Sequence, residues 1–314
     1  MANYIARRLL LGAIVIFLVS IIVFCLVQIL PGDPALYILG TNAPKEQLDF
    51  FRHEWGLDRP LPIQYMSWLG KAFQGDFGMS ITLHQPVGDL ILYRLPKTLH
   101  LSLFAFVIST ILGTAAGTIC AVKRGSIVDT VVTFFSNIGI SLPVFWLGML
   151  GIYFFGLKLG WVPTQGYTSP LDNFWLSTKQ ATMPIICLAI PAIAAIARQT
   201  RSSTLEVVRQ DYIRTARSKG LRETVIVFRH VLKNAFIPVI TLLGIQVGFL
   251  VGGQVLIENV FNIPGMGRLM TDGALNKDYP IVLACTMLIA ATVVLVNILI
   301  DLLYGWLDPR IRYD

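Results

Sequence analysis

The sequence predicts an all-α integral membrane protein with six transmembrane helices and both termini in the cytoplasm. Composition is the first reason: 55% of the 314 residues are hydrophobic and 14% are charged, which is too apolar for an ordinary soluble domain. The second is that several apolar runs approach or exceed the roughly 20 residues that a helix needs to cross a bilayer. The third is that Lys and Arg gather in alternate connecting segments, as the positive-inside rule requires. The net charge of +7 therefore concerns membrane topology, and no nucleic-acid partner is expected.

Six apolar runs account for the predicted spans. They cover residues 9–30, 99–122, about 130–157, about 181–197, 237–257 and 281–304. Pro143 interrupts the third run, and the fourth is short and contains Pro184 and Pro191. Proline is compatible with a membrane helix where neighbouring helices, side chains or water satisfy the freed carbonyl groups. A multi-pass protein is therefore expected in spite of these prolines.

The polar segment of residues 41–98 contains no run of spanning length and is predicted to be a helical extracytoplasmic insert. Two helices are expected in it, over residues 44–55 and 62–73, and both are rich in aromatic residues. Such helices suit the membrane–water boundary, where they either cap the membrane domain or contact a ligand. The chain is accordingly divided into residues 1–98, the first span with its insert, and residues 99–314, the membrane domain.

The most distinctive segment is a basic loop of about residues 198–236, which joins the fourth and fifth spans and contains nine of the 25 Lys and Arg residues. Its first half predicts one amphipathic helix, whose apolar face is formed by Leu205, Val208, Tyr212 and Ala216. Gly220 is expected to end this helix, and a second amphipathic piece is expected over residues 222–233. A solvated basic loop is the alternative, but it needs no apolar face. A compact knob that fits a groove on another protein explains both features.

The sequence offers no catalytic machinery. It lacks the G-x-x-x-x-G-K-[ST] loop that cradles nucleotide phosphates, the H-E-x-x-H and G-x-S-x-G motifs, and cysteine pairs at metal-ligand spacing. Ionisable residues are nearly absent from the spans, which disfavours an ion-coupled secondary carrier or channel that works alone. A membrane-embedded enzyme is less favoured still. The pattern favours a passive conduit driven by a partner, with no catalytic or metal-binding residue.

The fifth span contains glycines and polar residues that need an explanation. Its glycines at four-residue intervals, which share one helix face and permit close helix approach, are Gly244, Gly248 and Gly252. Its polar residues are Gln246, Gln254 and Glu258. One interpretation is helix packing, with the polar groups bonded to neighbouring helices. The other is a helix that lines a hydrated translocation path at a subunit interface, because unpaired amides in lipid are costly.

Residues 211–221, DYIRTARSKGL, resemble the cytoplasmic EAA loop of ATP-binding-cassette (ABC) importer permeases. The EAA triplet corresponds to Arg214, Thr215 and Ala216, and its downstream glycine to Gly220. Departures from the general pattern resemble the dipeptide/oligopeptide/nickel branch, whose loops read D-Y-x-R-T-A-R-x-K-G and H-x-L-[KR]-N-A. Segments similar to that branch occur along almost the whole chain: PGDP at 31–34, GDFG at 75–78, KRGS at 123–126, TRSS at 200–203, PGMGR at 264–268, DYP at 278–280 and DPRIR at 308–312. PGDP and the long insert resemble its first, B-type (DppB/OppB-like), permease subunit.

This resemblance implies one subunit of a binding-protein-dependent importer in a bacterial or archaeal cytoplasmic (inner) membrane. Its implied partners are a second homologous permease, two ABC ATPase subunits that carry ATP and Mg, and an extracytoplasmic solute-binding protein. The chain itself is then a non-catalytic permease that binds no cofactor. The implied cargo is di- or oligopeptides, with nickel chelates, glutathione or oligosaccharides as alternatives. The residues expected to couple the basic loop to an ATPase are Leu205, Val208, Asp211, Tyr212, Arg214, Thr215, Ala216, Arg217, Gly220 and Leu221.

Overall fold

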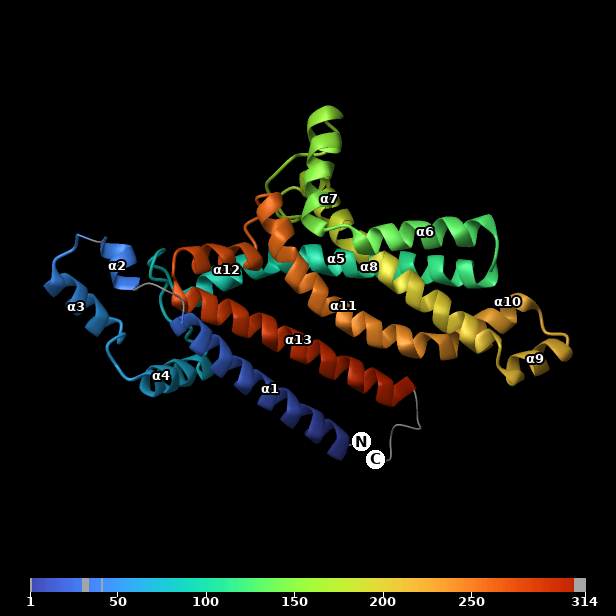
Figure 1. Cartoon of the computed structure of the whole chain (residues 1–314), viewed down its shortest axis with the longest axis horizontal. Coiled ribbons are helices and arrows are strands. Elements are labelled where there is room, and N and C mark those ends of the chain that lie inside the picture. The colour runs from blue at the N-terminus through green and yellow to red at the C-terminus, as the bar shows by residue number, and fades with distance from the viewer. Residues whose placement is uncertain (1, 30–33, 41, 308–314) are drawn as a thin grey trace. The chain divides into compact units, whose positions relative to one another are not determined.

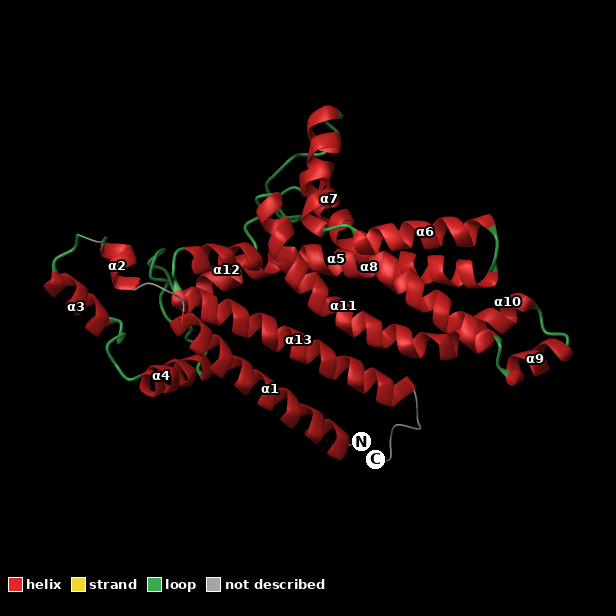
Figure 2. Ribbon diagram, viewed as in Figure 1, coloured by secondary structure: helices red, strands yellow, loops and turns green. Residues whose placement is uncertain are grey.

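The computed structural model describes residues 2–29, 34–40 and 42–307, which form helices joined by turns and loops (Figure 1, Figure 2). Within this described part, strand-like pairing is limited to one bridge between Met79 and Pro86. The predicted all-α architecture is therefore confirmed. The first residues of the PGDP segment, 31–33, and the C-terminal DPRIR segment lie outside the described residues.

The helices form two compact units, which are described separately. The N-terminal unit comprises Ala6–Thr98 and Pro264–Leu295, and the central unit is built mainly on Leu99–Ile263 with the described part of Val296–Asp314. Two long helices, α5 (Val87–Val122) and α13 (Tyr279–Leu307), contribute residues to both units.

The N-terminal unit has two apolar clusters. Its other helices are α1 (Ala2–Ile29), α2 (Pro34–Leu39), α3 (Lys45–Glu54), α4 (Leu61–Phe73) and α12 (Met266–Leu275). Helices α1, α4 and α13 meet in the cluster of Phe24, Val27, Tyr65, Tyr279 and Leu283. Helices α5, α12 and α13 meet in the cluster of Val87, Leu90, Ile91, Met266, Leu269, Ile281, Ala284 and Cys285. Burial of these side chains holds the insert helix α4 and the start of α5 to the apolar helices.

A buried carboxylate fixes the segment that leads into α5. Asp278 accepts hydrogen bonds at its Oδ2 atom from Ser80 Oγ at 2.6 Å, Thr82 Oγ1 at 2.8 Å and Thr82 N at 2.9 Å. Helix α5 then begins at Val87, twelve residues before the predicted second span at residue 99. The helix begins before the predicted span because Arg94 and Lys97 interrupt the apolar run, although charged residues do not stop a helix.

Helix α8 (Phe174–Val208) is the centre of the central unit, where it contacts α6 (Ile127–Ser141), α7 (Val144–Gly151) and α11 (Leu232–Val260). Its buried residues contribute strongly to a core with Leu101, Leu250, Ile257 and Phe261. The remaining elements are the π-helix η1 (Ile152–Lys158), α9 (Asp211–Ser218), α10 (Glu223–Val225) and the π-helix η2 (Ile226–Val231). The helix that contains the predicted fourth span of residues 181–197 extends beyond it at both ends, because Pro184 and Pro191 are accommodated inside one long helix.

Two glycines allow α5 to approach the backbone of α8. A Cβ atom on Gly113 would lie 2.7 Å from Ile196 Cβ and 3.0 Å from the Ile193 carbonyl oxygen. A Cβ atom on Gly117 would lie 2.7 Å from Thr200 Cβ and would overlap the carbonyl oxygen of Ala197. Gly113 and Gly117 are four residues apart, the spacing that lets helices pack closely in a membrane.

Five helices of the described residues are long and apolar enough to cross a membrane: Ala6–Ile29, Val87–Val122, Phe174–Val208, Glu223–Gly248 and Tyr279–Ile300. A sixth span results if Ile127–Ser141 and Val144–Lys158 are counted as one, although this pair is bent by 101°. The bend lies at Pro143, as the sequence predicts, because proline lacks an N–H and forces the preceding Leu142 into an extended conformation.

Candidate functional site

Beyond the end of α8, the basic loop folds as a small unit of α9, α10 and η2, which we call the head. Its helices differ from the predicted ones. Helix α8 ends at Val208, and Gln210 is extended, with φ −69° and ψ 148°, so that α9 starts in a new direction. Leu205 and Val208 therefore lie on α8, whereas Tyr212 and Ala216 lie on α9, and the single apolar face that we expected across all four is wrong. The predicted second piece, residues 222–233, is also not separate, because α10 and η2 run directly into α11.

An apolar cluster closes this head. Its buried members are Ile213, Ala216, Ile226 and Val231, with Val207 and Val208 packed against them. Ile213, Ile226 and Val231 are completely buried. The break after α8 is explained by this burial, because the turn places Ile213 and Ala216 of α9 against η2. The sequence pattern missed Ile213 by assigning the apolar face of α9 to Tyr212, which is 44% exposed.

Gly220 ends α9, as the sequence predicts. Its φ of +77° is in the left-handed region, Gly220 N donates to the Arg217 carbonyl at 2.9 Å, and Leu221 N donates to the Ala216 carbonyl at 3.4 Å. These two bonds form a Schellman motif, in which glycine is preferred because it has no Cβ. The chain therefore turns sharply between α9 and α10.

Polar contacts across this turn hold α9 to the elements that follow it. Arg217 Nη2 donates to Glu223 Oε1 at 2.6 Å and Arg217 Nε donates to Glu223 Oε2 at 3.3 Å, which raises the pKa of the Arg217 guanidinium. Asn234 Nδ2 of α11 donates to the Tyr212 hydroxyl at 2.8 Å. Because the Arg217–Glu223 pair is about half exposed, it contributes roughly 0.5 kcal/mol and mainly orients the head.

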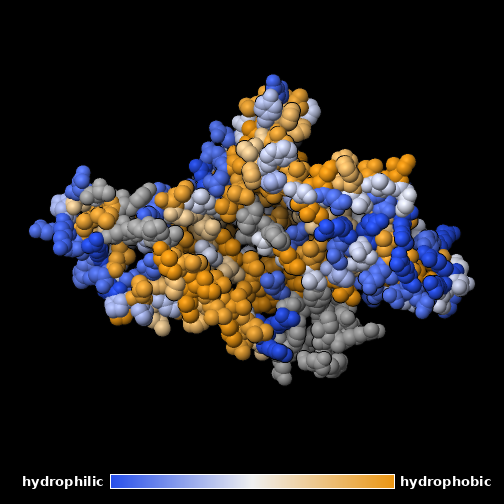
Figure 3. Space-filling view, in the orientation of Figure 1, coloured by the Kyte–Doolittle hydropathy of each residue, from blue (hydrophilic) through white to orange (hydrophobic). Residues whose placement is uncertain are grey.

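The outer surface of the head presents apolar side chains among charged ones. Phe228 is 72% exposed, and the other exposed apolar residues are Tyr212, Leu221 and Val225. The side chains of Asp211 and Arg214 are also mostly exposed. Figure 3 shows apolar atoms surrounded by hydrophilic atoms over α9 and α10. Phe228, which no sequence pattern indicated, is the most exposed of these four apolar residues.

A partly buried ion pair joins α6 to α8 in the first part of the basic loop. Arg201 donates from Nε to Asp129 Oδ1 at 2.6 Å and from Nη2 to Asp129 Oδ2 at 2.9 Å. Gly125 N donates to Asp129 Oδ2 at 3.0 Å, and Ser126 Oγ caps α6 by accepting from Asp129 N at 3.3 Å. The KRGS segment, through Ser126, and the TRSS segment, through Arg201, therefore both bind Asp129.

The predicted residues of α11 have different environments. Gly244 lies against α13, because a Cβ atom there would overlap Ile300, whereas nothing lies within 4 Å of a Cβ atom built on Gly248. The surroundings of Gly252 lie outside the described part of the chain. Gln246, Gln254 and Glu258 are buried, and Ser102 Oγ of α5 donates to Gln254 Oε1. This burial favours packing over path lining for the polar residues, and leaves Gly248 as the glycine on an open face.

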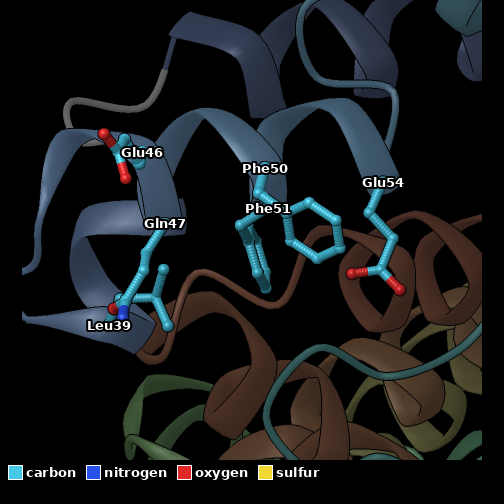
Figure 4. A pocket seen from close by; sticks show the side chains of 6 residues that line it. All are labelled: Leu39, Glu46, Gln47, Phe50, Phe51 and Glu54. Atoms are coloured by element: carbon cyan, nitrogen blue, oxygen red, sulfur yellow. The ribbon is translucent and has the colours of Figure 1, made fainter.

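The N-terminal unit has a cavity of its own, of about 410 Å³, between α2 and α3. Figure 4 shows the rings of Phe50 and Phe51 projecting from α3 on the side where Leu39 of α2 lies, and Glu46, Gln47 and Glu54 complete the lining. Among the described residues, no group of three His, Cys, Asp or Glu side chains could hold a metal ion. The cavity is therefore an apolar hollow with acidic edges.

Comparison with solved structures supports the fold. A chain of the inward-facing MetNI methionine ABC transporter superimposes with a TM-score of 0.54, covering 70% of this chain and 96% of that chain. The sequence identity is 21%, so this likeness concerns the fold alone.

Curated relatives match the full length of the chain. The protein named "Probable peptide ABC transporter permease protein y4tP", from Sinorhizobium fredii (strain NBRC 101917 / NGR234), is 42% identical over 313 residues, which is 100% of both chains. The glutathione transport system permease protein GsiC of Escherichia coli (strain K12) is also 42% identical over 313 residues and 100% of both chains.

Two family models cover most of the sequence. Residues 1–102 match the N-terminal domain of binding-protein-dependent transport system membrane components, and residues 113–313 match the binding-protein-dependent transport system inner membrane component. The folded head between α8 and α11, the multiple apolar helices and the full-length relatives agree with this match. The chain therefore belongs to the family of binding-protein-dependent transport system inner membrane components, and it is the non-catalytic permease subunit of an ABC transporter.

Proposed function

We propose that this permease forms part of the import path for di- and oligopeptides. Support comes from the relatives that match over their whole length, of which one is named for peptides and another for glutathione, itself a tripeptide. Uptake by the reconstituted transporter with its binding protein tests the cargo. A labelled dipeptide should enter and unlabelled oligopeptides should compete. Competition by glutathione alone would assign the narrower cargo.

The proposed arrangement in the membrane has six spans, with the bent pair of α6 and α7–η1 counted as one. Both termini and the basic loop then lie in the cytoplasm, and the insert with α3 and α4 lies outside. The Lys and Arg residues of the basic loop and of the Lys123–Arg124 turn support this orientation. A second permease completes the path, and a solute-binding protein delivers cargo from the outer side.

The observation that carries the coupling proposal is the exposed apolar surface of the basic-loop head. A loop that faces only water has no need of a 72% exposed phenylalanine, or of Tyr212 and Val225 exposed on the same head. An apolar helix surface with a charged rim is what a groove on a partner protein recognises. We propose that an ABC ATPase subunit supplies the groove and carries ATP and Mg. When the two ATPase subunits bind ATP and close together, they favour one of two packings of the permease helices. The head is the contact through which this preference reaches the membrane helices.

Replacing Phe228 with aspartate should release the ATPase subunits. The residue is exposed, so the change leaves the buried cluster of the head intact, but it places a charge where an aromatic anchor is desolvated on docking. We expect a loss of about 2 kcal/mol or more in subunit affinity, or roughly thirtyfold. Co-purification of the ATPase with a tagged permease measures it.

The matched control is Phe50→Asp, because Phe50 is 70% exposed but belongs to α3 of the insert. This variant should retain the ATPase at the wild-type ratio. If Phe228→Asp also retains the ATPase and transports normally, the head is not the docking surface.

Replacing Gly248 with leucine should disturb pairing with the second permease and spare the fold of this chain. A Cβ atom at Gly248 has open space around it, and leucine has a higher helix propensity than glycine. We therefore expect unchanged thermal stability of the isolated permease and at least a tenfold loss of heterodimer in pull-down, about 1.4 kcal/mol. Gly248→Ala is the control. Wild-type pairing and uptake in Gly248→Leu would remove Gly248 from the proposed interface.

A further inference from the structure

We propose that a cavity between α5, α6 and α8 binds a phosphate-bearing anion, which we call the anion cavity. Its volume is about 200 Å³, and it lies entirely within the central unit. Its polar lining consists of Thr133, Ser136, Asn137, Arg198, Arg201 and Ser202. The coupling of the head to an ATPase makes no use of these side chains.

The anion cavity is built by two helix faces that repeat one spacing. On α6 it is lined by residues 132, 133, 136 and 137, and on α8 by residues 197, 198, 201 and 202. Positions separated by one, four and five residues share one side of a helix, so α6 and α8 turn these sides toward the same space. Cys120 of α5 also lines it and is buried. Regular elements therefore hold every lining residue.

Arg201 is held in place at the edge of this space. Its Nε and Nη2 atoms donate to the two carboxylate oxygens of Asp129, so Asp129 makes no use of Nη1. The carboxylate balances the charge of this guanidinium, but the donor geometry is fixed before any ligand arrives. A planar guanidinium positioned in this way is suited to a tetrahedral oxyanion.

The other polar side chains provide donors without a protein partner. Within the described residues, no side-chain hydrogen bond or ion pair is formed by Ser136, Asn137, Arg198 or Ser202. Arg198 therefore adds a positive charge that no carboxylate of the described residues balances, and Ser136, Asn137 and Ser202 add uncharged donors. Ser136 is buried, whereas Asn137, Arg198 and Ser202 are exposed, so their donors are accessible to a ligand that enters from outside. One net positive charge together with several such donors suits an anion with several oxygens, for which a phosphate group is the matching chemistry.

Two sources can supply a phosphate group, a phospholipid headgroup or free phosphate. Next to the lining residues, Ile119 of α5, which adjoins Cys120, and Ile140 of α6, which lies one turn beyond Ser136, are exposed. These apolar side chains can receive acyl chains when the headgroup occupies the cavity. Basic pockets between membrane helices bind anionic headgroups in this manner.

The test uses the complete transporter of permeases and ATPases in nanodiscs of phosphatidylcholine, with and without phosphatidylglycerol. Native mass spectrometry after partial delipidation counts the retained phosphatidylglycerol. We expect Arg198→Gln and Asn137→Leu to lower retention about tenfold, because the first removes a positive charge and the second removes an amide donor from the cavity. Arg124→Gln removes the same charge from an exposed turn that does not line the cavity, and it should retain the wild-type amount. Ser202→Leu fills the cavity from its exposed side, and it replaces either of these variants in the test if that variant folds poorly.

A second arm measures binding of inorganic phosphate to delipidated transporter by calorimetry. Retention of phosphatidylglycerol that depends on Arg198 assigns the lipid headgroup, whereas phosphate binding with the same dependence and no lipid retention assigns the free anion. Either result supports the anion cavity. Equal behaviour of wild type and all cavity variants in both arms overturns it, and so does an equal loss in Arg124→Gln.

Discussion

Replacing Gly117 with valine is expected to separate α5 from α8 and to leave little folded permease in the membrane. A Cβ atom at Gly117 would overlap the Ala197 carbonyl oxygen and would lie 3.0 Å from Arg201 N, so the obstacle is the α8 backbone and not a flexible side chain. Close approach at small residues is also what packs membrane helices together, because lipid offers little hydrophobic drive for their association. We expect a loss of about 3 kcal/mol of stability, measured as thermal unfolding of the detergent-solubilised permease.

The matched control is Ala115→Val on the same helix. Ala115 lies two residues before Gly117 and is exposed. A valine at this position therefore avoids the contact with the α8 backbone that a side chain at Gly117 would make. Its melting temperature should remain within a few degrees of the wild type. A Gly117→Val permease as stable as Ala115→Val would show that α5 and α8 separate without cost.

Much of the fold could be predicted because apolar runs report membrane helices directly. The ends of the helices were harder to predict, because hydropathy follows lipid contact and not helical structure. Arg94 and Lys97 hid the first turns of α5, and Pro184 and Pro191 hid the true length of α8. The close approach of α5 to α8 was visible as Gly113 and Gly117 at four-residue spacing, but only the glycines of the fifth span were singled out.

The basic loop could be located from its charge and from Gly220, but its internal packing could not. The predicted apolar face treated α8 and α9 as one continuous helix. It therefore assigned Tyr212 to the buried face of the head, whereas Ile213 is the residue that is buried there. The turn at Gln210 allows Ile213 to pack with Ile226 and Val231. These two partners lie beyond Gly220 in the sequence, so a local pattern does not reveal them. The Asp129–Arg201 pair is missed for the same reason, because its two residues are distant along the chain.

Replacing Ala216 with aspartate is expected to unfold the head and to uncouple transport from ATP hydrolysis. Ala216 is 8% exposed and packs with Ile213, Ile226 and Val231, so a carboxylate at this position has no partner within the cluster. Burial of an unpaired charge costs several kcal/mol, which is more than one small apolar cluster supplies, and the head opens to avoid it. Limited proteolysis should then cleave the basic loop rapidly, and the ATPase should no longer co-purify.

The membrane helices should survive this change, because the cluster of Ile213 and Ala216 is separate from the core that surrounds α8. Ala216→Ser is the control: it adds one small uncharged polar atom and should keep both protease resistance and the ATPase. The two variants together separate loss of the folded head from loss of a docking surface, since Phe228→Asp is expected to release the ATPase with the loop still protected. Protease resistance and full transport in Ala216→Asp would mean that the apolar cluster does not hold the head in its docking form.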